Sequence, residues 1–161
     1  MSADGHGRLV IIISLCIAML LTILPMPEWA RPFRPQWVTL VLLYWAIALP
    51  HRIGVGSGFV VGIVLDVLTG TLLGQHALGL SVVTFIAIQL HQRIRVFPFW
   101  QQSLGVLVLL IIERLLALWV TGATRGETPG LIYWTVPLIG ALLWPWIFVT
   151  LRSVRRQFGV S

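Results

Sequence analysis

The chain has 161 residues, of which 58% are hydrophobic and 10% are charged, and its formal net charge is +6. A soluble domain is about 45–50% apolar and about 25% charged, so a chain this short and apolar cannot cover itself with polar surface. The composition argues against a soluble enzyme and predicts a single integral membrane domain over residues 1–161, with lipid as its main solvent.

Six apolar segments follow one another along the chain, separated by prolines, glycines and charged residues. They cover residues 9–24, 33–49, 55–73, 77–90, 99–120 and 130–151. Several are shorter than the roughly 20 residues of a usual transmembrane helix. We predict an all-α fold, a polytopic transmembrane helical bundle of about six short spans; five spans with one re-entrant segment is the alternative.

The two terminal segments carry local signals. The first follows Arg8 but lacks a small-x-small cleavage site, so we expect it to be retained as a helix and not removed as a signal peptide. Pro137 and Pro145 lie inside the sixth and predict kinks there.

Arginine placement predicts the orientation. With six spans and the N-terminus inside, the cytoplasmic side carries Arg8, Arg52, Arg93, Arg95, Arg152, Arg155 and Arg156, against Arg31, Arg34 and Arg125 outside. Cytoplasmic loops carry the excess of basic residues, so both termini are expected in the cytoplasm. Because the arginines lie between apolar runs, they indicate membrane faces and a lipid partner, with no nucleic acid.

Small residues recur every fourth position around the third segment: Gly54, Gly58, Gly62, Asp66, Gly70 and Gly74. Positions four apart share one face of a helix, and missing side chains let another helix approach closely. The stripe predicts either a helix–helix seam inside this protein or a face that binds a partner's transmembrane helix or a ligand.

Asp66 is the most informative single residue. An ionised carboxylate in hydrocarbon costs about 2.5–3.5 kcal/mol or more unless it is paired. At 1.5 Å per residue, Asp66 and Arg114 lie at similar depths in their segments. We therefore expect Asp66 to face the bundle interior with a partner or a proton, either in an Asp66–Arg114 pair between helices or in a small intramembrane ionic network of Asp66, Glu113 and Arg114.

Catalytic and metal motifs are not evident in the sequence. The histidines form no His-x-x-x-His or Glu-x-x-His pair, and there is no P-loop and no Gly-x-Ser-x-Gly motif. We expect no catalytic residues, no metal and no cofactor. Asp66 with Glu113 as a catalytic carboxylate pair is the weakest of the hypotheses.

Short motifs in order along nearly the whole chain resemble the MreD family of rod shape-determining proteins. They are Phe33-Arg34-Pro35-Gln36-Trp37, Leu43-Tyr44-Trp45, Leu49-Pro50-His51-Arg52, Gly56-Ser57-Gly58-Phe59, Leu65-Asp66, Leu143-Trp144-Pro145-Trp146 and Arg155-Arg156-Gln157-Phe158. The loop 121–129 and Arg114 match nothing in that pattern.

The resemblance implies a non-enzymatic component of the bacterial inner-membrane rod complex, or elongasome, which supports peptidoglycan synthesis and rod shape. It implies binding to the bitopic scaffold protein MreC, and through it indirect links to MreB, RodZ, RodA and penicillin-binding protein 2. It also implies a fold like the substrate-binding S-components of energy-coupling-factor transporters.

The sequence therefore leaves two functional hypotheses open. The first is an interaction protein whose candidate contact surfaces are the third-segment stripe and the run from Phe33 to Trp37. The second is a small-molecule-binding membrane module like a vitamin-transporter S-component, which needs convergent polar groups in a pocket. A membrane enzyme acting on lipid-linked precursors has the least support.

Overall fold

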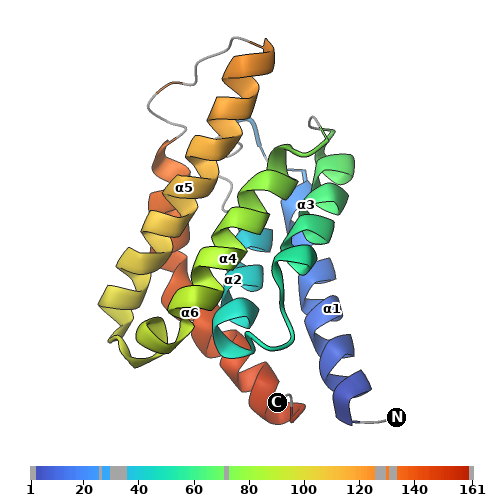
Figure 1. Cartoon of the computed structure of the whole chain (residues 1–161), viewed down its shortest axis with the longest axis vertical. Coiled ribbons are helices and arrows are strands. Elements are labelled where there is room, and N and C mark those ends of the chain that lie inside the picture. The colour runs from blue at the N-terminus through green and yellow to red at the C-terminus, as the bar shows by residue number, and fades with distance from the viewer. Residues whose placement is uncertain are drawn as a thin grey trace.

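The computed structural model describes residues 3–25, 27–29, 36–70, 73–125, 130 and 134–159. The six helices that it contains confirm the predicted all-α fold (Figure 1). They are α1 (Ala3–Ile23), α2 (Trp37–Ala48), α3 (Val55–Thr69), α4 (Gln75–Val96), α5 (Phe99–Arg125) and α6 (Thr135–Gln157).

Successive helices run in alternating directions along the bundle. As a result α1 begins and α6 ends at the same end of the molecule, which we call the terminal end (Figure 1). The opposite end carries the turn between α3 and α4 and the last turns of α5.

Among the described residues, three helical stretches are long and apolar enough to cross a membrane: Gln75–Val96, Phe99–Val120 and Thr135–Gln157. Gly7–Ile23, Trp37–Ala48 and Val55–Thr69 are apolar but shorter. At 1.5 Å per residue, α2 is only about 18 Å long, against a hydrocarbon core of about 30 Å. Backbone beyond the ends of such a helix is tolerated at membrane depth where it is buried in protein.

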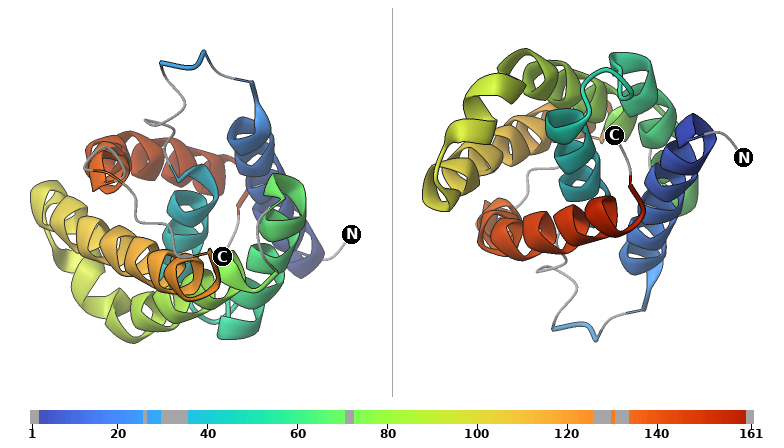
Figure 2. Two further views of the ribbon diagram at one scale, coloured as in Figure 1. Left: turned by 90° about the horizontal axis from the view of Figure 1, so that it is seen from above. Right: turned by 90° about the horizontal axis from the view of Figure 1, so that it is seen from below.

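Helix α2 forms the centre of the bundle. Every residue from Val38 to Ile47 is buried, including the large side chains of Tyr44 and Trp45. The end-on views show α2 surrounded by the other helices (Figure 2). A helix that is hydrophobic all round is stable only when neighbours cover every face, which explains why the most apolar short segment lies innermost.

Polar side chains connect the helices inside this apolar core. The Trp45 indole N–H donates to Ser14 Oγ at 2.8 Å and so joins α2 to α1. The Trp144 indole N–H of α6 donates to Gln102 Oε1 of α5 at 3.3 Å, and Gln102 Nε2 donates to the Ile94 carbonyl of α4 at 3.1 Å. Such bonds between helices are preferred in lipid because water cannot satisfy these groups there.

The helix bounds differ from the apolar segments at most ends. Polar residues extend α1 back to Ala3, α4 on to Val96, α5 to Arg125 and α6 to Gln157. Helices continue past the apolar run because their backbone bonds are internal, so a hydropathy boundary marks the membrane edge and not the helix end.

The sixth segment differs from the prediction at Pro137. Helix α6 begins at Thr135, which puts Pro137 in its first turn, where the backbone N–H groups have no partner within the helix. The predicted kink at Pro137 is therefore wrong, and Pro145 is the proline that lies inside the helix.

Candidate functional site

The glycine stripe of α3 lies against α4. A Cβ added at Gly62 would be 2.3 Å from Ala77 Cα and 2.5 Å from Ala77 N, and one added at Gly58 would be 2.9 Å from the Leu80 carbonyl oxygen. Both glycines and Asp66 are buried. The two backbones meet where no side chain would fit, so in this structure Gly58 and Gly62 form a seam inside the protein and are not open to a partner's helix.

Gly70 and Gly74 do not belong to this stripe, contrary to the expectation that it continues through them. Gly70 ends α3 with φ 71°, and Gly74 precedes α4 with φ 101°. A Cβ at either position would meet nothing within 4 Å. Both positions favour glycine because of their left-handed backbone, which turns the chain from α3 into α4.

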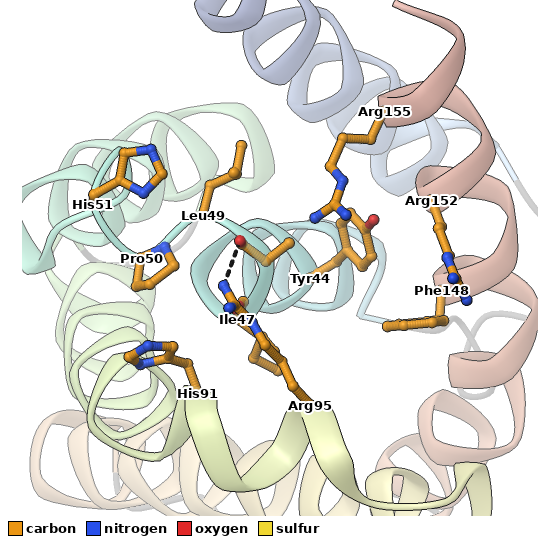
Figure 3. Close-up of a pocket in the computed structure, with 11 residues that line it drawn as sticks. Tyr44, Ile47, Leu49, Pro50, His51, His91, Arg95, Phe148, Arg152 and Arg155 are labelled. Atoms are coloured by element: carbon orange, nitrogen blue, oxygen red, sulfur yellow. Dashed lines mark hydrogen bonds between the residues drawn. The ribbon is translucent and has the colours of Figure 1, made fainter. Parts of the chain in front are cut away.

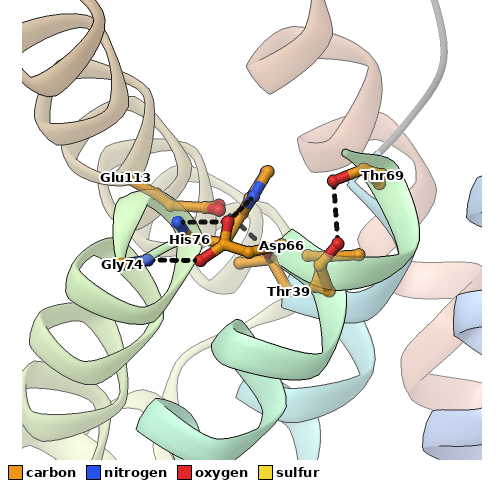
Figure 4. A network of polar contacts seen from close by, with 7 residues as sticks. Thr39, Asp66, Thr69, Gly74, His76 and Glu113 are labelled. Atoms are coloured by element: carbon orange, nitrogen blue, oxygen red, sulfur yellow. Dashed lines mark hydrogen bonds and ion pairs between the residues drawn. The ribbon is translucent and has the colours of Figure 1, made fainter. Parts of the chain in front are cut away.

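Asp66 lies in the last turn of α3 with 0% of its surface exposed. Its carboxylate accepts the backbone N–H of Gly74 and of His76, each at 2.9 Å, and lies 2.7 Å from His76 Nδ1 (Figure 4). These donors belong to the start of α4, where backbone N–H groups lack helical partners and the helix dipole favours negative charge. The turn from α3 into α4 thus supplies the pairing that a buried carboxylate needs.

Glu113 of α5 is a second buried carboxylate, 3% exposed. It accepts hydrogen bonds from Thr39 Oγ1 at 2.8 Å and from Gln36 Nε2, both at the start of α2. His76 and the adjacent Arg114 also interact with it electrostatically. We call Asp66, His76, Glu113, Thr39 and Gln36 the carboxylate network; Figure 4 shows Asp66, His76, Glu113 and Thr39 converging.

Glu113 also lies at a close approach between α4 and α5. A Cβ added at Gly79 of α4 would be 2.9 Å from Glu113 Cγ. The network therefore brings together one end of α2, the middle of α5 and the turn between α3 and α4.

His76 is a partner of Asp66 that the sequence analysis did not name. Its Nδ1 lies 2.7 Å from Asp66 Oδ1. The signal was available: a short turn after Asp66 brings the first turn of the next helix back beside it. An Asp66–Arg114 pair stays a prediction.

Of the two aromatic candidates for partner contact, Phe33 and Trp37, the structure describes Trp37. Phe33 lies outside the described residues. Trp37 is the first residue of α2, and its half-buried side chain packs against the hydrophobic core.

The carboxylate network is suited to holding helices together. Among the described residues, no group of three His, Cys, Asp or Glu side chains could hold a metal ion. The groups around Asp66 and Glu113 are hydrogen-bond donors to the carboxylates, which fixes the helices relative to one another.

Comparisons with known proteins find a family model and a relative that match most of the chain. The model of the family described as rod shape-determining protein MreD matches residues 4–154. A protein of Haemophilus influenzae named rod shape-determining protein MreD is 35% identical over 145 residues, which cover 88% of this chain and 87% of that protein. No solved structure matches the chain, so the expected likeness to transporter S-components stays a prediction.

Proposed function

The chain belongs to the MreD family of rod shape-determining proteins, and we propose that it is a non-enzymatic inner-membrane component of the complex that directs elongation of rod-shaped cells. In this role it binds the scaffold protein MreC and thereby supports peptidoglycan synthesis. Its links to MreB, RodZ, RodA and penicillin-binding protein 2 are indirect, through MreC. The family match over nearly the whole chain is the observation that carries the proposal.

We place the protein in the membrane with both termini in the cytoplasm. The alternating helix directions and the arginine-rich terminal end support this orientation, since cytoplasmic faces carry more Lys and Arg. The opposite end, with the α3–α4 turn, then faces the periplasm.

The surface proposed for MreC is the outer face of α3, which we define as Gly56, Val60, Val64 and Val67. The glycine stripe on the other side of α3 is occupied by α4, so a partner must use the exposed side. Val60 is 61% and Val67 is 66% exposed. Nothing lies within 4 Å of a Cβ at Gly56, which leaves room for another backbone.

This face suits a transmembrane helix of a bitopic partner. Helices associate in lipid mainly through van der Waals packing at small residues. Valine side chains have one strongly preferred rotamer in a helix, so they lose little freedom when another helix packs on them. α3 packs chiefly on α4 and only slightly on α1, which leaves most of its outer side accessible.

Site-specific photo-crosslinking in native membranes tests this proposal. A photoreactive residue at position 60, 64 or 67 should capture MreC. The matched control positions are Leu104 and Leu115, which are also exposed and apolar but lie on α5. Capture of MreC from α5 and not from α3 would refute the assigned surface, and absence of MreC from every position in shape-competent cells would refute direct binding.

The second hypothesis, a vitamin-binding module like a transporter S-component, lacks such support inside the bundle. It needs polar groups directed at a ligand there, whereas both buried carboxylates accept hydrogen bonds from the protein itself.

A further inference from the structure

A pocket of about 780 Å³ opens at the terminal end, between the ends of α2 and α4 and the last turns of α6. Among the described residues that line it are three arginines and two histidines, but no Asp or Glu: they are Arg95, Arg152, Arg155, His51 and His91. In Figure 3, Arg152 and Arg155 reach in from α6, and His91 and Arg95 from α4. We call this the basic pocket.

One of these arginines already has a structural role. Arg95 Nε donates to the Ile47 carbonyl at 2.9 Å, and its Nη2 donates to the Ala48 carbonyl at 2.6 Å. These carbonyls belong to the last turn of α2, where no helical N–H remains to bond them. Arg95 therefore offsets the negative end of the α2 dipole, which would otherwise repel an anion.

The other two arginines are available for a ligand. Within the described part of the chain, the guanidinium group of neither Arg152 nor Arg155 makes a hydrogen bond or an ion pair. They lie three residues apart, so they project from the same side of α6. A guanidinium presents a planar fork of donors that matches the oxygens of a phosphate.

The remaining wall of the pocket is apolar or aromatic. The rings of Tyr44 and Phe148 line it with centroids 5.5 Å apart in an edge-to-face arrangement, and Leu49 and Pro50 complete it. Charged groups beside apolar surface at a helix end match the boundary between headgroups and acyl chains.

We propose that the basic pocket binds a phosphate-bearing anion, the phosphate of an anionic lipid headgroup or a soluble phosphate. Arg152 and Arg155 hold the phosphate oxygens, and His51 adds a donor from the opposite side, since His91 Nδ1 already donates to the Ile88 carbonyl of its own helix at 2.6 Å. This inference is independent of MreC binding.

Lipid retention by the purified chain, measured by native mass spectrometry, tests the proposal. The detergent-solubilised protein should retain phosphatidylglycerol in preference to phosphatidylcholine with the same acyl chains. The double variant Arg152→Gln/Arg155→Gln should bind phosphatidylglycerol about 25-fold more weakly, because each arginine near an anionic surface contributes about 1 kcal/mol, or about fivefold.

The matched control is Arg93→Gln/Arg156→Gln, which removes the same charge from neighbouring positions that do not line the pocket. It should retain phosphatidylglycerol nearly as the parent chain does. Equal losses in both double variants, or no preference for phosphatidylglycerol over phosphatidylcholine together with no binding of inorganic phosphate, would overturn the proposal.

Two further arms complete the test. If inorganic phosphate binds and the loss follows Arg152 and Arg155 while lipid shows no preference, the site stands and its ligand is soluble. If the glutamine variant does not fold, Arg152→Lys/Arg155→Lys keeps the charge but loses the planar fork. That variant should weaken binding measurably, and unchanged binding would contradict the role of the arginines.

Discussion

At the scale of single residues, the glycines of the third segment separate into two kinds. Gly58 and Gly62 are needed because α4 lies where a Cβ would be, whereas Gly70 and Gly74 are needed because of their positive φ. The regular spacing in the sequence joined these two requirements into one pattern. Only the course of the backbone separates them, because a period of four cannot show where a helix stops.

Substitution of Gly62 tests the close approach. Gly62→Ala should destabilise the folded protein by about 1–3 kcal/mol, as overpacking of a tight contact does, because the Cβ would meet the Ala77 backbone and α3 would have to move. Gly62→Leu should be worse. Thermal unfolding in detergent measures the effect.

Gly56→Ala is the matched control in the same helix, since a Cβ there meets nothing within 4 Å. It should leave the melting temperature unchanged or raise it, because alanine favours helix over glycine by up to about 1 kcal/mol. Equal melting temperatures for Gly62→Ala and Gly56→Ala would argue against the α3–α4 seam.

Asp66→Asn tests the carboxylate at the start of α4. An amide oxygen and an NH2 replace two equivalent acceptors, so one of the two backbone N–H donors, of Gly74 or of His76, loses its bond. An unsatisfied buried donor costs about 1–3 kcal/mol, and the melting temperature and cellular abundance should fall accordingly.

The control for Asp66→Asn is Glu28→Gln, which removes the same charge from an exposed position between α1 and α2. It should change neither the melting temperature nor the cellular abundance. If Asp66→Asn behaved like Glu28→Gln, the carboxylate would have no part in joining the two helices.

At the scale of helices, the hydrogen bonds of Glu113 connect α5 to the start of α2. Thr39→Val keeps the shape of the side chain but removes one donor from a buried carboxylate. A hydrogen bond to an ionised carboxylate contributes about 1.5–3 kcal/mol to stability. We therefore expect the free energy of unfolding, measured by thermal unfolding, to fall by that amount.

Ser81→Ala is the appropriate comparison, because the Ser81 hydroxyl donates to the Ala77 carbonyl of its own helix at 2.6 Å. Its loss should change stability by no more than about 0.5 kcal/mol. The reverse order of the two variants would show that Glu113 does not hold α2 and α5 together.

At the scale of the whole molecule, much of the fold could be predicted because lipid imposes strong constraints on sequence. Six apolar runs gave six helices, and the alternation of direction follows from their short connections. Periodicity also indicated that Gly58, Gly62 and Asp66 share a face, and α4 now occupies it.

The remainder depended on contacts distant in sequence. The pairing of Glu113 with Thr39 spans 74 residues, and that of Arg95 with the Ile47 carbonyl spans 48. No local pattern encodes such distances. The similar depths of Asp66 and Arg114 in their helices suggested that these two residues pair. Depth does not specify how each helix is rotated about its own axis, so it could not show that His76 lies beside Asp66.

Cysteine accessibility tests the central claim, a six-helix bundle in the membrane with both chain ends on one side. On a Cys16→Ser background, Ala123→Cys and Gly130→Cys should react with a membrane-impermeant maleimide added outside intact spheroplasts. Gln92→Cys and Ser153→Cys, at the terminal end, should react only after the membrane is opened. Labelling of Ser153→Cys together with Ala123→Cys in intact spheroplasts would contradict this arrangement.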